Sequence, residues 1–396
     1  MITARSFNYR VCFVNHRGMA LIVTLALISI FMTAILELVR LSKDCADIEQ
    51  KTADRFQAEQ IARSGVELAM FILAYDAQQN EIDSVQEIWA DPEILASAAD
   101  LLGFDQKISS LDVLITDELG KIQINALLAQ FPGNLINSDQ SALWERFLNL
   151  IISNDKSADL RDPAEIINSI KDWLDSGDDD AISGLSGAES DYYSSLDPPV
   201  VCSNAPLNKV EELFMIKGVP QNLTAMPEQL VSKNLTDIKL TDMNYNSQSQ
   251  SAPIDLEPSK IFTVYGIDSS KKEGAKNTYP GTININTADQ IVLAAMLPAG
   301  MEDQASELVN FRMERDENGK TFTNALNRGW YKKVISLSPK DAQEFERIVR
   351  YSSDLFRVDA SARFNESDFT LTGFIKREQM PKSGKWGCTI IQLTGN

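Results

Sequence analysis

The sequence predicts an α+β protein with a long N-terminal helix, an antiparallel β-sheet and a large α-helical domain inserted into that sheet. Three observations predict this class. An uninterrupted apolar segment opens the chain and leads into an amphipathic pattern, strand-like segments occur early and at the end of the chain, and a long stretch of helical pattern lies between them. The 396 residues are enough for about two or three modest domains.

The first forty residues predict a membrane anchor behind a short basic leader. Residues 19–36 (MALIVTLALISIFMTAIL) carry no charge, and at about 1.5 Å per residue such a run crosses a hydrocarbon core of roughly 30 Å. Arg5, Arg10 and Arg17 precede it without an acidic residue, so the leader should stay cytoplasmic and the remainder should be exported. A signal peptide would show a shorter apolar region and an A-x-A-like cleavage site. No such site follows, and a plain signal-anchor helix remains the alternative.

Net charge limits the partners of the exported part. The formal net charge is -19, and loss of a leader with three arginines would leave -22. Because binding of nucleic acid requires a basic surface, this composition argues against it. A strongly negative exported domain suits cation binding or high solubility.

Histidine and cysteine usage excludes several chemistries. The only histidine, His16, lies in the leader, which removes histidine-based triads, general bases and metal ligands from the mature chain. The four cysteines include no C-x-x-C pair, so no zinc or redox motif is visible. A Cys202–Cys388 disulfide is compatible with an oxidising compartment, but spacing alone does not establish it.

Residues 42–75 predict one helix that continues the anchor. Apolar residues recur at three- and four-residue steps, and no proline occurs before Pro92. The alternative is a break near Lys43 and Asp44. Helical patches follow at 85–89 and 92–102. A β-hairpin is predicted by two strand-like segments on either side of the turn-like TDELGK, namely 111–115 (LDVLI) and 122–124 (IQI).

The middle of the chain is predicted to be mainly helical. Asp162 followed by Pro163 is a helix-start signal. The expected helices are 141–152, 162–174, 208–215, 289–296 and 302–315. A Ser/Asn/Gln-rich segment, 232–252, predicts a mobile connection, and 261–265 predicts a strand. Alternation then predicts three antiparallel strands, 355–362, 369–375 and 388–393. Because the helices lie between two groups of strands, they are expected to form an insertion.

Residues 172–193 (DWLDSGDDDAISGLSGAESDYY) form the strongest candidate site. The crowded carboxylates belong to Asp175, Asp178, Asp179, Asp180, Glu189 and Asp191. Like charges this close repel, so a compact loop needs either full solvation or a bound cation. Ca²⁺, with six to eight oxygen ligands at about 2.3–2.6 Å, suits such a loop. The spacing does not match an EF-hand, because Asp180 stands where that motif needs glycine. A solvated acidic loop and a carboxylate pair for glycoside hydrolysis remain alternatives.

Several motifs together resemble a known family. The junction Arg17-Gly18-Met19 resembles the leader of type IV prepilins and type II secretion pseudopilins, which a prepilin peptidase cuts after the glycine. The further motifs are DELGKIQINAL (117–127), DWLDSGDDD (172–180), GAESDYY (187–193), APLNKVEELFMIKGV (205–219) and GTININTA (281–288). In this order and spacing they resemble the large minor pseudopilin K of type II secretion systems.

The resemblance implies a pilin-like fold whose sheet carries an inserted SAM-like or helix-hairpin-helix-like domain. It implies cleavage after Gly18, a methylated Met19 as the new N-terminus, and single-pass insertion in the inner membrane with a periplasmic bulk. It also implies a non-enzymatic protein at the pseudopilus tip, whose partners are minor pseudopilins I and J and the major pseudopilin. The implied division is a leader at 1–18, the transmembrane half of the helix at 19–41, pseudopilin parts at 42–126 and 351–396, and an inserted domain at 127–350 with sub-parts of about 127–260 and 280–350.

The resemblance further implies calcium in the inserted domain. The DW-x-D motif would supply Asp172 and Asp175, and the GAE motif would supply Glu189. Asp178, Asp179 and Asp191 are candidate ligands by proximity only, and Asp172 could instead cap a turn.

The identity of the fifth mature residue, Val23, bears on where the subunit lies in a filament. Most of the superfamily has Glu there, and that Glu is thought to neutralise the amino terminus of the preceding subunit within lipid, where an unpaired charge is costly. A subunit without it cannot make that contact with a subunit beyond it, which suits a first or terminal subunit. The K subtype lacks this Glu.

Two other classes of function stay open from the residues. A membrane-anchored, calcium-dependent exported enzyme or adhesin would keep an uncut N-terminus. A helix-hairpin-helix DNA-uptake component would need a basic face despite the net charge.

Overall fold

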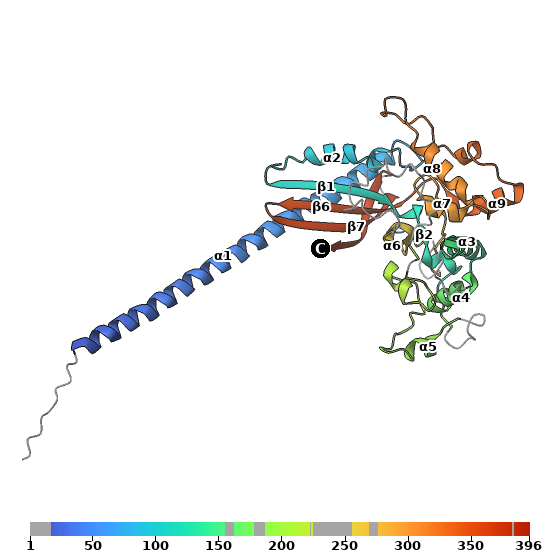
Figure 1. The fold of residues 1–396 in the computed structure, drawn as a ribbon. Helices are drawn as coiled ribbons and strands as arrows, with labels where there is room; N and C mark the ends of the chain where they lie inside the picture. The colour runs from blue at the N-terminus through green and yellow to red at the C-terminus, as the bar shows by residue number, and fades with distance from the viewer. Residues whose placement is uncertain are drawn as a thin grey trace, which may run out of the picture.

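The computed structural model describes residues 17–154, 162–177, 187–221, 223–224, 256–268, 276–381 and 384–396. Figure 1 shows a single long helix, α1 (Arg17–Asp76), that leads into a four-stranded sheet, with a mostly helical part at the end remote from the N-terminus. The predicted connection at 232–252 lies outside the described residues. The predicted fold class is confirmed, whereas the residue limits drawn for its domains stay predictions.

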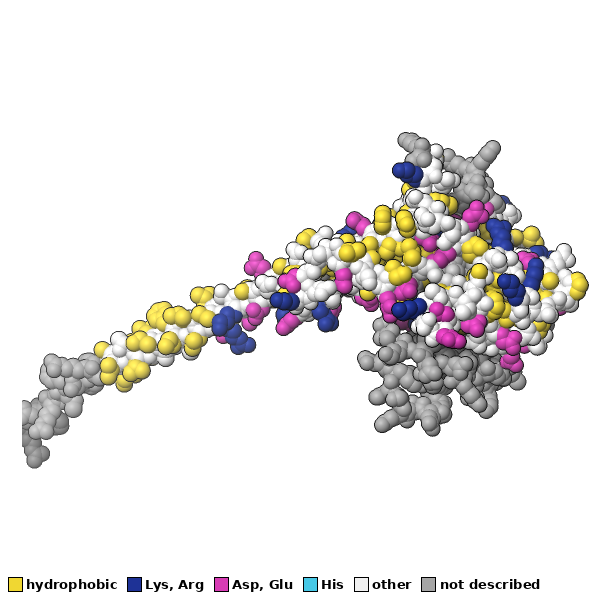
Figure 2. Space-filling model, turned by 90° about the horizontal axis from the view of Figure 1, so that it is seen from above, with side chains coloured by type: hydrophobic (Ala, Val, Ile, Leu, Met, Phe, Trp, Pro, Cys, Tyr) yellow, Lys and Arg dark blue, Asp and Glu magenta, His cyan; other side chains and the backbone are white. Residues whose placement is uncertain are grey.

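Helix α1 runs without a break for 60 residues, so the predicted continuous helix is confirmed and the break near Lys43 and Asp44 is wrong. Every side chain from Met19 to Ala53 is exposed. Figure 2 shows apolar side chains covering the first part of the helix, with charged side chains beginning beyond it. The helix contains an apolar segment of a length and composition that can cross a membrane.

The last third of α1 packs on the sheet through small residues. Ala58, Ala62 and Ala69 are fully buried there. A Cβ added at Gly65 would lie 2.9 Å from Leu111 Cδ1, so the helix approaches strand β1 too closely for a larger residue. Alanine and glycine at these positions therefore set the distance between helix and sheet.

The sheet has the order β1-β6-β7-β8 and is antiparallel throughout. Its strands are β1 (Ser109–Asp117), β6 (Leu355–Phe364), β7 (Ser367–Gln379) and β8 (Trp386–Gly395). The three predicted C-terminal strands are confirmed and are longer than predicted. Before β1, the 3₁₀ turn η1 (Ile88–Ala90) leads into α2 (Pro92–Asp100), which is capped by Asp91 and packs beside β1.

The predicted hairpin of 111–115 with 122–124 is wrong. Strand β1 pairs with β6, while β2 (Ile122–Gln123) pairs in parallel with β3 (Phe262–Thr263). The reason lies at Asp117, whose Oδ1 accepts a 2.8 Å hydrogen bond from Leu119 N and starts the 3₁₀ turn η2 (Glu118–Gly120). This turn takes the chain out of the sheet, so TDELGK begins a crossover and does not close a hairpin.

The chain between β1 and β6 is called here the inserted part, and none of its described residues belongs to the four-stranded sheet. Its principal helices are α3 (Ser138–Asn154), α4 (Pro163–Leu174), α7 (Gln290–Met296), α8 (Ala305–Met313) and α9 (Pro339–Ile348). Its short elements are η3 (Ile124–Leu127), α5 (Ser190–Ser194), η4 (Val210–Met215), α6 (Pro258–Ile261), η6 (Glu302–Gln304), η7 (Trp330–Lys333) and the parallel pair β4 (Ile283–Asn284) with β5 (Val349–Arg350).

Several predictions for the inserted part need adjustment. The predicted helix 208–215 is a 3₁₀ helix, the strand 261–265 shortens to two residues after α6, and 302–315 begins as the 3₁₀ turn η6. Helix α9 was not predicted. Asp162 caps α4 as predicted, because its Oδ1 accepts a 2.9 Å hydrogen bond from Ala164 N.

Two hydrophobic cores hold the described residues together, one under the sheet and one in the inserted part. Trp89 meets Phe356 edge-on at 5.2 Å in the first, and Trp144 stacks on Phe262 at 5.3 Å in the second. Cys202 belongs to the inserted core, whereas Cys388 packs against the sheet core, and neither forms a disulfide. The Cys202–Cys388 disulfide considered from the sequence is therefore not formed, because the two side chains belong to separate cores.

Candidate functional site

Three acidic side chains of the inserted part meet at one buried point. Single carboxylate oxygens of Asp172, Asp175 and Glu189 all lie within 4.8 Å of one another. All three residues are buried, with Asp172 fully so. For these three residues the interpretation as a solvated acidic loop does not hold, because water does not reach them freely.

The site is built where helix α4 ends and the short helix α5 begins. Asp172 lies in the last turn of α4, Asp175 is its C-cap residue, and Glu189 precedes α5 as its N-cap residue. Beneath them Trp173 and Tyr193 pack edge-on at 4.7 Å. The alternation of buried aromatic and acidic residues thus fixes the two helix ends against each other.

Lys217 holds in place the residues around Glu189, on the α5 side of the site. Its backbone N donates a 3.1 Å hydrogen bond to Tyr193 Oη, and its Nζ donates a 3.3 Å bond to Gly187 O. The same ammonium lies 4.7 Å from the centre of the Tyr192 ring. Burial raises the pKa of the Tyr193 hydroxyl, which therefore stays neutral.

The electrostatics of the site favour a bound cation. Lys171 Nζ lies 2.8 Å from Asp175 Oδ2 and 3.8 Å from Asp172 Oδ1. Three carboxylates thus meet in one buried place, and like charges this close repel one another. A bound cation would relieve that repulsion.

The donor set fits a hard divalent ion. Oxygens that share one Ca²⁺ at about 2.3–2.6 Å lie at most roughly 5 Å apart. The 4.8 Å limit on the three carboxylate oxygens is consistent with contact to a single ion. Asp172, Asp175 and Glu189 are therefore the residues that would hold calcium, and Gly177 N already steadies Asp175 Oδ1 at 3.2 Å.

Of the remaining predicted ligands, Asp191 is the one that lies among the described residues, and it does not join this group. Asp191 lies in α5 but is exposed and outside the cluster. Asp178 and Asp179 lie outside the described residues.

The predicted processing site lies at the start of α1, which begins at Arg17 and so includes Gly18 and Met19. Val23 is 53% exposed on this bare part of the helix. Its side chain is therefore available to lipid or to another helix.

Sequence reasoning missed a buried polar junction between the sheet and the inserted part. Asp117 Oδ2 accepts hydrogen bonds from Ser353 Oγ and Thr287 Oγ1, both at 2.6 Å, and from Asn284 Nδ2 at 2.9 Å. Asn284 Nδ2 also reaches Asp83 O at 3.1 Å. The DELGK and GTININTA motifs thus meet in space, although they are far apart in sequence. Their polar residues between apolar ones were the available signal.

A second buried group, centred on Arg377 of β7, adjoins this junction. Its Nη2 contacts Asp83 Oδ1 at 2.5 Å and Ser353 O at 2.7 Å, and its Nη1 contacts Asp76 Oδ2 at 3.1 Å. Asp76, Asp83 and Glu87 also bring their oxygens within 4.8 Å of one another. Because Arg377 of β7 contacts Asp76 of α1 as well as Asp83, this group joins α1 to β7.

The carboxyl groups around Arg377 have raised pKa values. The pKa of Asp76 is raised to about 6, because burial and the nearby Asp83 charge together outweigh the lowering effect of Arg377. The pKa of Glu87 is raised to about 8, mainly by burial and also by the charge of Asp76. The junction therefore changes charge within the physiological pH range.

Taken together, a long helix with an exposed apolar first half, packed by its second half on an antiparallel sheet, is a pilin-like fold whose apolar half fits a single-pass membrane anchor. Residues 120–232 match the family model described as type II secretion system (T2SS), protein K. These residues include the buried carboxylate cluster. This stretch of the chain is thus similar to the type II secretion system protein K family, the family that its motifs resemble.

Two relatives give the extent of the similarity. The type II secretion system protein K of Klebsiella pneumoniae is 26% identical over 212 residues, which are 52% of this chain and 59% of that protein. The matched region thus spans less than two thirds of that relative. The fold is similar to a chain in the crystal structure of the GspK-GspI-GspJ complex from the enterotoxigenic Escherichia coli type 2 secretion system. That similarity has a TM-score of 0.53 at 14% identity and covers 88% of this chain and 99% of the other.

Proposed function

We propose that this protein is a minor pseudopilin at the tip of the type II secretion pseudopilus, where it initiates or caps assembly with minor pseudopilins I and J. The observation that carries the proposal is the match of residues 120–232 to the protein K family in a chain whose anchor helix runs unbroken into a pilin-like sheet. The role is structural, and the proposal assigns no catalytic step to any residue.

The shape of the molecule supports a terminal position. In a filament built on α1, a further subunit would have to be added beyond the end of the helix remote from the membrane. Figure 1 shows the inserted part at that end. With Val23 in place of a glutamate, the anchor also lacks the carboxylate that would pair with another subunit's amino terminus in lipid.

The proposal includes processing and orientation. Prepilin peptidase would cut after Gly18 on the cytoplasmic side of the inner membrane, and Met19 would become the methylated N-terminus. The body of the protein would then lie in the periplasm, close to the major pseudopilin. Mass spectrometry of the protein purified from membranes should find a chain beginning at methylated Met19, and an intact chain from Met1 in the working assembly would contradict the proposal.

Partner binding is the second test. The full chain should co-purify with pseudopilins I and J of the same system from detergent-solubilised membranes. A chain that binds neither pseudopilin I nor pseudopilin J would overturn the tip assignment, at whichever residue the chain begins.

We also propose that Asp172, Asp175 and Glu189 hold a structural Ca²⁺ that joins α4 to α5. The meeting of three buried carboxylates supports this, since a divalent ion would relieve their mutual repulsion. When bound, the ion would supply only compensation of charge and oxygen coordination. Asp178 and Asp179 remain proposed as further ligands.

Calorimetry with CaCl₂ on the purified full chain tests the calcium proposal. Asp175→Asn should weaken binding about tenfold or more, because it removes one charged ligand. Asp191→Asn is the matched control, since Asp191 is exposed and outside the cluster. Equal affinities in both variants, or no binding by the wild type, would contradict the site.

A further inference from the structure

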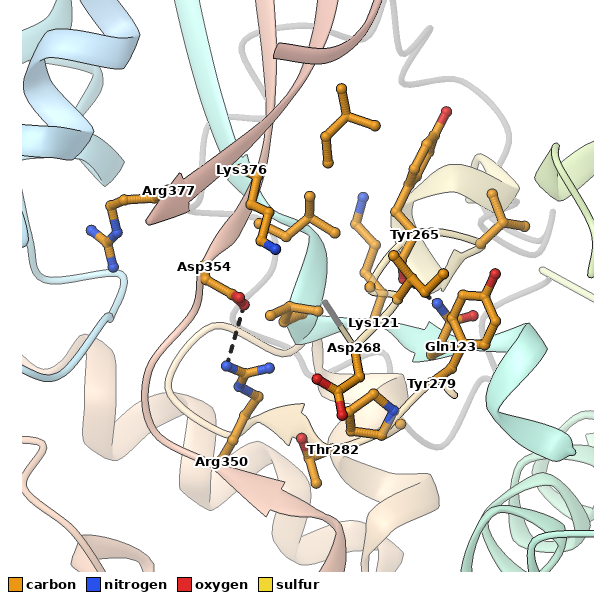
Figure 3. A pocket seen from close by; sticks show the side chains of 18 of the residues that line it. Lys121, Gln123, Tyr265, Asp268, Tyr279, Thr282, Arg350, Asp354, Lys376 and Arg377 are labelled. Carbon is orange, nitrogen blue, oxygen red and sulfur yellow. Dashed lines mark hydrogen bonds and ion pairs between the residues drawn. The ribbon is translucent and has the colours of Figure 1, made fainter. Parts of the chain in front are cut away.

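A cavity of about 740 Å³ lies between the outer face of the sheet and the inserted part. Figure 3 shows Lys376, Asp354 and Arg350 on one side of it and Tyr265 and Tyr279 on the other. Its volume falls within the usual range of ligand pockets, about 300–1,000 Å³. The cavity is neither part of the carboxylate cluster nor part of the membrane anchor.

The cationic lining of the cavity has carboxylate neighbours. Arg350 Nη2 lies 3.5 Å from Asp354 Oδ1, and Lys376 Nζ lies 3.9 Å from Glu378 Oε2. Because the charges are balanced locally, the cavity offers little gain to a free ion. Its tyrosines and balanced charges suit an uncharged polar or aromatic side chain.

The cavity opens beside a free sheet edge. Strand β8 pairs with β7 on one side, and among the described residues no strand pairs with its other side. Its ten residues, WGCTIIQLTG, include no charge and no proline, and Ile390 and Ile391 are 46% and 50% exposed. Proteins usually blunt such edges with charged residues, proline or a covering element. At the opposite edge of the sheet, α2 packs beside β1 and serves as such a covering element.

Edge and cavity form one continuous surface. Trp386, Ile391 and Gln392 belong to β8 and also line the cavity. Tyr265 of the inserted part lies over this end of the sheet, stacked on Phe374 at 3.9 Å and donating a 2.6 Å hydrogen bond to Gln392 Oε1. A chain segment laid along β8 would therefore pass the mouth of the cavity.

We propose that the free edge of β8 accepts an extended strand of a neighbouring pseudopilin and that one side chain of this strand enters the cavity. The inference rests on the proposed function. An open edge presents a row of N–H and C=O groups, and only another extended backbone satisfies such a row. The chemistry of the edge therefore selects a strand, and the alternation of its side chains places every second one toward the cavity face.

The position of β8 identifies a neighbouring subunit as the source of the strand. Strand β8 packs directly against α1, the helix along which subunits of the proposed filament would lie. A subunit packed on α1 brings its own sheet next to β8. The absence of charge along β8, in a chain of net charge -19, also fits a strand edge that must be desolvated on assembly.

The test combines a charged edge variant with hydrogen–deuterium exchange on the full chain in detergent. Ile391→Lys should weaken binding to pseudopilins I and J about tenfold or more, because a lysine at the edge opposes strand addition. Leu114→Lys is the matched control, since Leu114 is 47% exposed on the opposite edge strand, and its binding should stay unchanged. In the wild type, exchange of the amides in 387–394 should slow when the partners bind.

The outcomes separate this inference from the proposed function. Binding with unchanged exchange along β8, or wild-type affinity of Ile391→Lys, would overturn strand addition while leaving the tip assignment intact. Slow exchange along β8 in the isolated chain would mean that a segment of the same chain covers the edge, which also overturns it. A wild type that binds neither partner would overturn both. Since the exchange measurement uses the wild type, it still tests strand addition at β8 if Ile391→Lys does not fold.

Discussion

Replacing Arg377 with methionine tests how the sheet is joined to α1 and to the inserted part. The Arg377 side chain is only 6% exposed, and it contacts two carboxylates, Asp76 and Asp83, as well as Leu73 O and Ser353 O. Arg377→Met keeps much of the side-chain volume but leaves both acids buried without their cation. Breaking a buried ion pair in this way costs about 3–5 kcal/mol. We expect a loss of that size in the free energy of unfolding at neutral pH.

The same sheet provides a matched control. Arg363 and Asp368 form an ion pair at 2.6 Å, but both side chains are more than half exposed. Arg363→Met should leave the unfolding midpoint unchanged, because water already solvates the partner carboxylate. Denaturant unfolding of the detergent-solubilised chain can be followed by tryptophan fluorescence, since Trp89 and Trp386 lie near the junction.

A double variant then separates lost charge from lost packing. Adding Asp83→Asn to Arg377→Met removes one of the two uncompensated carboxylates and should recover part of the lost stability. A loss below about 1 kcal/mol for Arg377→Met would refute the reasoning. So would a loss no larger than that of Arg363→Met.

Three further predictions follow from other parts of the molecule. Because burial raises the pKa of Glu87 from 4.5 to about 8, the folded state holds a proton that the unfolded state releases, and stability should fall as pH rises from about 4.5 to 8. Glu87→Gln should lessen that fall, and parallel pH profiles of wild type and variant in thermal unfolding would contradict the assignment. Gly65→Val should destabilise the fold by about 1–3 kcal/mol, since even a Cβ would lie 2.9 Å from Leu111, and a denaturant unfolding midpoint equal to that of the wild type would contradict the close packing of helix and sheet. Val23→Glu should leave folding and membrane insertion intact, as measured by fractionation and circular dichroism, and loss of insertion would show that our account of the fifth mature residue is wrong.

Local patterns predicted the elements that depend on local chemistry. The period of the apolar residues predicted α1 as one helix, and Asp162 before Pro163 predicted the start of α4. Alternation predicted the three C-terminal strands. In each case the signal lies within a few residues of the element that it specifies.

Long-range pairing could not be predicted in the same way. TDELGK has the composition of a hairpin turn, yet the partner of β1 is β6, and the chain between them spans the whole inserted part. The Asp117 interactions with Ser353 and Thr287 that favour this pairing join positions distant in sequence. For the candidate site, the sequence named Asp172, Asp175 and Glu189 among six acidic residues. It could not show that Asp191 is exposed and outside the cluster, because the position of α5 is fixed only when this helix packs.

The middle of α1, which is exposed on every side, has a mechanical consequence. Between the predicted transmembrane half, 19–41, and Asp54, the first buried residue of the helix, the twelve residues 42–53 are exposed on every side. At about 1.5 Å per residue they span roughly 18 Å. The globular body would therefore stand clear of the lipid headgroups on a rigid stalk, and a push delivered to the anchor would reach the body along one unbroken column of hydrogen bonds.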